Sequence, residues 1–124
     1  MRLSRRAFCA LVERAIADLP SQFAPYLEEL TVDVEDMPNA ALVRELELDD
    51  PRELLGLYQG EPLTERNVDH AMRWPERIVI YQLNVQRACR TRAEIIEQVR
   101  KTVLHEIGHH FGLDEEDLDD LGYG

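Results

Sequence analysis

The sequence has very few cysteines. Only Cys9 and Cys89 are present, and they lie far apart in the chain. Small secreted domains that depend on disulfides carry several cysteines at short spacings. The sequence therefore excludes a disulfide framework and favours a reducing compartment, so we expect the protein to be cytoplasmic.

Long hydrophobic runs are also missing. No apolar segment reaches the roughly 20 residues that a membrane-spanning helix needs. The start of the chain, Ser4–Phe8, superficially resembles a twin-arginine export signal. However, Glu13 and Arg14 interrupt the apolar region that such a signal requires. We therefore expect an amphipathic first helix rather than a signal or a membrane anchor.

Positive charge is scarce in this chain. The 14 lysines and arginines are outnumbered by 25 aspartates and glutamates, which gives a formal net charge of -11 at pH 7. Nucleic acids and anionic membranes are polyanions and repel such a chain. The composition thus argues against nucleic acid and membrane as main partners and favours basic or neutral substrates, and a peptide or protein is the expected partner. It leaves the oligomeric state open.

The chain shows no sign of being divided into several domains. It contains no repeats, no low-complexity segment and no Gly/Ser-rich linker. Its 124 residues suffice to bury a core, and its hydrophobic fraction of 44% is ordinary for a globular protein. We therefore expect residues 1–124 to form a single domain.

Hydrophobic periodicity divides the chain into helices and strands. Apolar residues recur at three- and four-residue steps from Arg5 to Leu19, which predicts a helix with one buried face. Apolar runs predict three strands, at Leu30–Asp36, Leu54–Gln59 and Arg77–Leu83. Between the first two strands the residues suit either a short helix or a turn. The predicted fold class is α+β, with a small mixed sheet packed against an N-terminal helix and a second, long helix.

This long helix is predicted from Thr91 to His110. Thr91 and Glu94 have the spacing of a capping box, in which each side chain binds the backbone N–H of the other residue. The expected apolar stripe consists of Ile96, Val99, Val103 and Ile107. A different face carries polar residues that suit a cleft, namely Gln98, Thr102, His105 and His109.

The strongest functional signal is the H-E-x-x-H sequence at the end of this helix. Its histidines, His105 and His109, lie one turn apart on the same helix face, so both imidazoles can reach one metal ion. Glu106 can hold a metal-bound water and accept its proton. The motif is short enough to occur by chance, but Gly112 can end the helix directly after it. We predict a Zn2+ site with His105 and His109 as ligands and Glu106 as the catalytic residue.

A third zinc ligand is expected just beyond the helix. In the extended pattern H-E-x-x-H-x-x-G-x-x-H the third histidine follows the glycine by three residues. Glu115 occupies that position here, and carboxylates bind zinc, so we expect Glu115 to be the third metal ligand. Asp114 or Glu116 could serve instead. Acidic residues at a helix start are also favoured by the helix dipole without any metal.

The remaining histidines and the second cysteine receive no catalytic role. His110 points about 100° away from His109 around the helix, which favours packing over metal binding. His70 lies in a polar loop. Cys89 is expected to be a buried thiol near the start of the long helix.

The predicted reaction is metal-assisted hydrolysis. Zinc makes water more acidic and polarises a carbonyl group. Glu106 would act as the general base and then pass the proton to the leaving amine. A peptide substrate could add to the sheet by β-augmentation, and Ile78–Leu83 is the candidate strand for it.

Several segments together resemble a known family, the small bacterial zincin-like metallopeptidases, or minimal zincins. The resemblance extends from about Thr31 onwards and is carried by Val34–Pro38, Leu55–Gly60, Pro75–Ile78 and His105–Leu113. It implies an α+β minimal zincin-like fold, Zn2+ at His105 and His109, Glu106 as the catalytic residue and an acidic third ligand at Glu115. The chain differs from metzincins, which have a methionine turn after the motif, because all three methionines precede His105.

The alternative is a zinc-binding regulatory or interaction module without turnover. The small size of the chain favours this alternative, because little sequence remains to build specificity pockets or a lid. An acidic interaction protein without any metal is a third possibility. Metal analysis and a Glu106→Gln substitution would separate the three.

Overall fold

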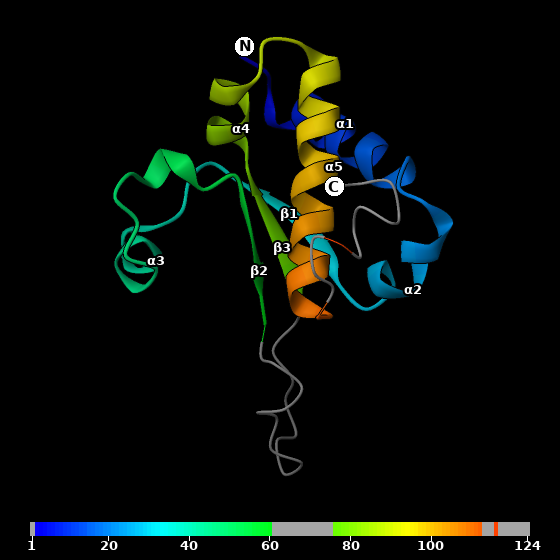
Figure 1. Cartoon of the computed structure of the whole chain (residues 1–124). Helices are drawn as coiled ribbons and strands as arrows, with labels where there is room; N and C mark the ends of the chain where they lie inside the picture. The colour runs from blue at the N-terminus through cyan, green and yellow to red at the C-terminus, as the bar shows by residue number, and fades with distance from the viewer. Residues whose placement is uncertain (1, 61–75, 113–115, 117–124) are drawn as a thin grey trace.

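The computed structural model describes residues 2–60, 76–112 and 116. The chain combines helices with a small three-stranded sheet (Figure 1), which confirms the predicted α+β class. In chain order they are α1 (Arg5–Ala17), α2 (Ala24–Leu27), β1 (Thr31–Glu35), α3 (Ala40–Glu45), β2 (Gly56–Gln59), β3 (Arg77–Tyr81), α4 (Gln82–Ala88) and α5 (Arg92–His110), with 3-10 turns at Ser21–Phe23 and Pro51–Glu53.

The three strands form one mixed sheet in the order β1-β3-β2. β3 pairs with β1 in parallel and with β2 in antiparallel orientation. Strands that are buried on both faces have sequences of consecutive apolar residues. β3 fits this rule, because its residues from Ile78 to Tyr81 are fully buried.

The central position of β3 contradicts one prediction. We expected a peptide to add to the strand at Ile78–Leu83, and this expectation is wrong because both sides of β3 are already paired. In addition, the chain turns helical directly after Tyr81, so Leu83 belongs to α4 and not to the strand. Within the described residues, the outer edges of the sheet are those of β1 and β2.

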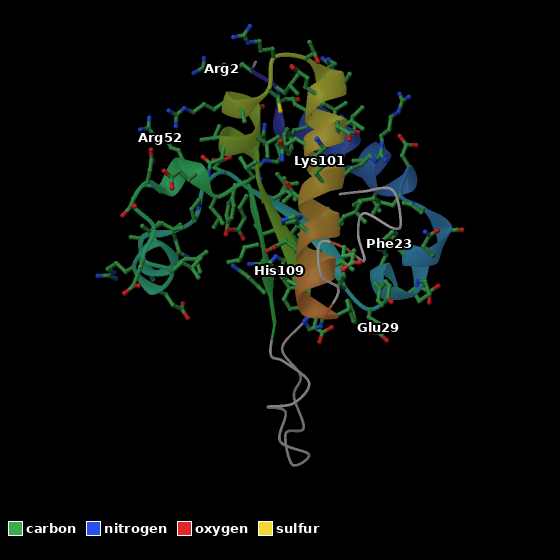
Figure 2. All side chains as sticks on the ribbon, in the orientation of Figure 1. Arg2, Phe23, Glu29, Arg52, Lys101 and His109 are labelled. Carbon is green, nitrogen blue, oxygen red and sulfur yellow. The ribbon has the colours of Figure 1, made fainter. Side chains whose placement is uncertain are left out.

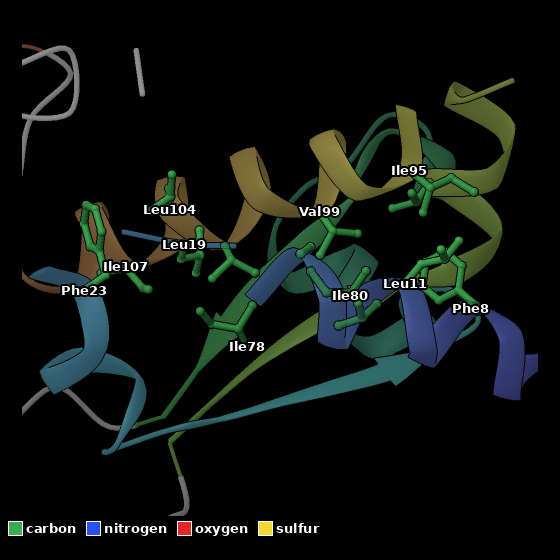
Figure 3. Close-up of a cluster of buried hydrophobic side chains, with 14 of the residues drawn as sticks. Phe8, Leu11, Leu19, Phe23, Ile78, Ile80, Ile95, Val99, Leu104 and Ile107 are labelled. Atoms are coloured by element: carbon green, nitrogen blue, oxygen red, sulfur yellow. The ribbon is translucent and has the colours of Figure 1, made fainter. Parts of the chain in front are cut away.

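The hydrophobic core lies where α5 packs against α1 and the sheet (Figure 3). Fully burying one large aliphatic or aromatic side chain stabilises a fold by about 1.5–3 kcal/mol. The cluster therefore fixes α5 firmly on the sheet. Figure 3 shows its members from α1, β3 and α5 together, including Phe8, Leu11, Ile78, Ile80, Ile95, Val99, Leu104 and Ile107.

The predicted long helices are confirmed with small changes at their boundaries. α1 ends at Ala17, two residues before the predicted end, and Asp18 is its C-cap. The buried stripe of α5 begins at Ile95, whereas the half-buried Ile96 only packs against its edge. The region between β1 and β2 contains both a short helix, α3, and a turn at Pro51–Glu53.

Helix α4 was not predicted, because its hydrophobic pattern is inverted. Its buried residues include Gln82, Asn84 and Gln86, while Leu83 is 45% exposed. Each of these buried amides has at least one backbone partner, although Gln82 Oε1 has none among the described residues. Asn84 Nδ2 donates to the carbonyl oxygen of Leu54 at 2.7 Å, and Gln82 Nε2 donates to that of Leu3 at 3.0 Å. Helix α4 thereby fixes both the start of the chain and the approach to β2.

Two further expectations concern membranes and thiols. No helix within the described ranges is both long and apolar enough to cross a membrane. Cys89 is buried, as predicted. The pKa of its thiol is raised, mainly by burial and to a smaller extent by the negative charge of Glu94. Both cysteines are free thiols.

Candidate metal and catalytic site

The proposed site lies at the C-terminal end of α5, and the sequence determines where this helix begins and ends. At its start, Thr91 and Glu94 form the predicted capping box. At its end, Phe111 is the C-cap and Gly112 follows with φ +73°. This left-handed conformation strains residues with a Cβ but not glycine. The end of α5 therefore falls where the sequence predicts it.

His105 and His109 lie side by side on an exposed face of α5. Their ring centres are 5.5 Å apart and the rings are tilted by 48°. Two imidazoles bound to one tetrahedral zinc at the usual nitrogen–zinc distance of about 2.0–2.1 Å have ring centres about 5 Å apart. The observed spacing is close to this value, and neutral imidazole nitrogens are ordinary zinc ligands.

Glu106 points towards β2 and contacts its backbone. The N–H of Tyr58 donates a hydrogen bond to Oε1 of Glu106 at 2.8 Å. The carboxylate is partly buried at this contact. A backbone donor cannot rotate as a side chain can, so it holds the carboxylate in a fixed direction.

His110 packs against β2, as expected for a residue that points away from the ligand face. Its ring stacks on that of Tyr58, with centroids 4.0 Å apart, and its Nε2 lies 3.1 Å from the Tyr58 hydroxyl. Phe111 follows and contacts Tyr26 of α2, with ring centroids 4.4 Å apart. The end of α5 is therefore held between β2 on one side and α2 on the other.

A cavity of about 300 Å³ opens between β2 and the histidine-bearing face of α5. The cleft that we expected on this face is therefore present. Gly56 lies at its β2 side, where an added Cβ would come within 2.6 Å of Thr102 Cγ2. Glycine thus allows β2 and α5 to approach closely. The cavity is lined by Leu55, Gly56, Gln98, Lys101, Thr102, His105 and Glu106.

The structure does not test the predicted third ligand. Glu115 and its alternative Asp114 lie outside the described residues, as does His70. Glu116 is described and exposed. Among the residues that the structure describes, no group of three histidine, cysteine or acidic side chains is arranged to hold a metal ion. The structure places the rings of His105 and His109 next to each other, has His105 and Glu106 line the same cavity, and leaves the metal site and its third ligand as predictions.

Tyr58 and Lys101 are among the residues at this site that sequence reasoning missed. Tyr58 contacts both Glu106 and His110 across about 50 residues of sequence, and no local spacing indicates such a contact. Lys101 could have been found, because it precedes His105 by one helical turn and must lie on the same face.

Comparisons with known proteins bear on the family of this chain and on its fold. The sequence profile described as zincin-like metallopeptidase matches residues 27–124. A solved structure of a conserved hypothetical protein from Thermo thermophilus is similar, with a TM-score of 0.56 and 23% sequence identity over 88% of this chain and 94% of that one. At this identity the likeness shows a shared fold. No curated protein matches the sequence. Since the profile covers most of the chain, the protein belongs to the zincin-like metallopeptidase family.

Proposed function

We propose that the protein is a zinc-dependent metallopeptidase in which His105 and His109 bind the metal and Glu106 is the general base. The observation that carries this proposal is the spacing of the two imidazoles, 5.5 Å between ring centres, beside a carboxylate fixed by β2. Glu115 is the proposed third ligand. When bound, zinc acts as a Lewis acid that makes water a better nucleophile and polarises a carbonyl.

Glu106 has one carboxylate oxygen available for proton transfer. Oε1 accepts the hydrogen bond from the Tyr58 N–H. No donor to Oε2 is found among the described residues, so this oxygen can take a proton from the attacking water. The same oxygen can then deliver the proton to the leaving amine of the peptide, as a general base that becomes a general acid does.

The outer edge of β2 is the proposed docking strand for a peptide. Tyr81 N–H donates to the Leu55 carbonyl, so the alternation of an antiparallel ladder turns the N–H groups of Gly56 and Tyr58 away from β3. The Tyr58 N–H indeed points to Glu106. Because the Tyr58 N–H is bound to Glu106, a substrate backbone would pair with the other outward groups of this edge and would run beside the catalytic carboxylate. β2 thus takes the role that we first expected of β3.

Metal analysis followed by a peptide-cleavage assay tests the proposal. The purified protein should contain zinc, and His105→Ala should lose it. The zinc-loaded protein should cleave members of a peptide mixture, detected by mass spectrometry. A Glu106→Gln variant keeps an oxygen to accept the Tyr58 N–H but loses the base, so its rate should fall by about 100-fold or more.

The matched control is Glu97→Gln. This change removes the same charge from an exposed glutamate of α5 that pairs only with Arg100 in the described contacts. We expect its cleavage rate to equal that of the unmodified protein. If Glu106→Gln cleaves peptides as fast as the unmodified protein, Glu106 is not the base. If zinc removal lowers the melting temperature but no peptide is cleaved, the protein is a zinc-binding module without turnover.

The predicted cytoplasmic location and the single domain stay predictions. Neither the helices nor the comparisons address the compartment. Fractionation of cells that produce the protein would test the first, and limited proteolysis would test the second.

A further inference from the structure

Lys101 is the sole lysine of the chain, and it lines the cavity beside the candidate site. Every other one of the 14 basic residues is an arginine. Lys101 is exposed and shares the cavity wall with His105 and Glu106 (Figure 2 labels it along α5). It lies one helical turn before His105, about 6 Å along the helix axis.

The polar neighbours of Lys101 in the cavity are already bonded to each other. The Thr102 hydroxyl donates to the Gln98 carbonyl oxygen at 2.8 Å, and Gln98 Nε2 lies 3.3 Å from the Thr102 hydroxyl oxygen. In contrast, no carboxylate of the described residues forms an ion pair with Lys101, although arginines elsewhere form several. The ammonium group is therefore the charged donor that the cavity offers to a ligand.

We propose that this cavity is a subsite for an acidic side chain of the substrate, bound through the Lys101 ammonium. The proposal rests on the peptidase function proposed above and adds a substrate class to it. A cavity of about 300 Å³ is at the small end of ligand pockets, which suits one side chain. An extended peptide advances about 3.3–3.6 Å per residue, so the acidic residue lies within about two residues of the cleaved bond.

The net charge of -11 does not oppose this preference. Charges on the surface are largely screened beyond about 8–10 Å at physiological salt, so the nearest charge decides the local attraction. A lysine attracts a carboxylate as a point charge and forms a charge-assisted hydrogen bond with it. The carboxylate of Glu106 is directed to the Tyr58 N–H at the β2 side of the cavity.

Paired peptides that differ only by glutamate or glutamine test the preference. The zinc-loaded protein should cleave the glutamate peptide faster when that residue lies near the cleaved bond. Lys101→Met keeps an unbranched apolar side chain without the charge, and it should lower the ratio of the two rates by about fivefold. Lys101→Arg should retain most of the preference. Arg92→Gln removes a charge from the other end of α5 and should leave the ratio unchanged.

A binding measurement separates this inference from the proposed hydrolysis. Reductive methylation with ¹³C-formaldehyde labels only Lys101 and the terminal amine, because the chain has no other lysine. Acetyl-glutamate amide should shift the Lys101 signal in NMR spectra, and acetyl-glutamine amide should not. If the shift occurs but no peptide is cleaved, the subsite stands and the peptidase function fails.

Two outcomes overturn the subsite. The first is an equal response of the Lys101 signal to both amides, or no response to either. The second is cleavage of both peptides with a rate ratio that is the same in the unmodified protein and in Lys101→Met. In the second case the hydrolase stands without this specificity.

Discussion

The two ends of α5 are held by contacts of different range. At its start, the Glu94 N–H donates to Thr91 Oγ1 at 3.1 Å and the Thr91 N–H donates to Glu94 Oε2 at 2.9 Å, so four consecutive residues suffice. At its end, Glu106 and His110 both contact Tyr58 on β2, which is remote in sequence. The start of the helix is therefore specified locally, whereas the geometry of the site depends on how β2 lies against α5.

This difference separates stability from activity. A change at the capping box should loosen the first turn of α5 and lower the free energy of unfolding without moving Glu106. A change between β2 and α5 should affect both the free energy of unfolding and the proposed hydrolysis. Three substitutions test this comparison.

The largest effect is expected from Gly56→Val. Its Cβ would lie 2.6 Å from Thr102 Cγ2 and 3.0 Å from the Val79 carbonyl oxygen, and the latter belongs to the backbone and cannot turn away. β2 must then move away from α5. We expect a loss of about 1–3 kcal/mol in the free energy of unfolding, and a fall in kcat as the Tyr58 N–H leaves Glu106.

Urea unfolding and peptide cleavage measure these two effects. Gly112→Ala is the control. An added Cβ at this position would contact no atom within 4 Å, so the substitution is disfavoured only by the left-handed backbone conformation, φ +73°. It should lower stability by about 1–2 kcal/mol. A Gly56→Val protein that unfolds and cleaves like the unmodified one would show that the β2–α5 contact does not position the site.

Thr91→Ala tests the start of the helix. The N-cap hydroxyl accepts the Glu94 N–H, and its loss leaves that donor without its partner. Such a change costs about 1 kcal/mol of stability. The cleavage rate should stay unchanged at temperatures where the variant is folded, and Thr91→Ser should restore the stability. If Thr91→Ala instead has normal stability but cleaves peptides more slowly, the start of α5 affects the site and not stability, which contradicts this expectation.

The smallest effect is expected from Glu94→Gln, and it should depend on pH. The backbone N–H groups of Arg90 and Thr91 lower the pKa of Glu94 below its ordinary value of 4.5. The folded state thus favours the charged carboxylate, and this stabilisation is complete at neutral pH and lost as the pH falls below 4.5 and through the lowered pKa. The difference in melting temperature between the two proteins should therefore shrink in acid. A difference that persists unchanged in strong acid would exclude this cause.

Periodicity in the sequence predicted the elements that obey the usual hydrophobic pattern. The strands β1, β2 and β3 and the helices α1 and α5 lie where their apolar spacing places them, with shifts of a few residues at the ends. Helix α4 could not be predicted in this way, because it buries Gln82, Asn84 and Gln86 and exposes Leu83. Backbone partners from distant segments make this inversion possible, and periodicity does not reveal such partners.

The same distinction applies to the candidate site. His105, Glu106 and His109 belong to one helix, so their spacing alone predicts that they meet. Tyr58 and Gly56 lie on β2, and their register against α5 follows from the pairing of β2 with β3. The order of the strands was likewise open, and this is why β3 was wrongly taken as the docking strand.

The backbone of Leu3 is bound at both of its polar groups by helix α4. Its N–H donates to Gln86 Oε1 at 3.1 Å, and its carbonyl oxygen accepts from Gln82 Nε2 at 3.0 Å. A truncated chain without Leu3 would remove one partner from each of these two buried amides and leave them only their bond to each other, from Gln82 Nε2 to Gln86 Oε1 at 3.0 Å. An affinity tag at the N-terminus should therefore be joined through a flexible spacer that leaves Leu3 in place, since this half-buried residue packs against the core and is bonded to α4.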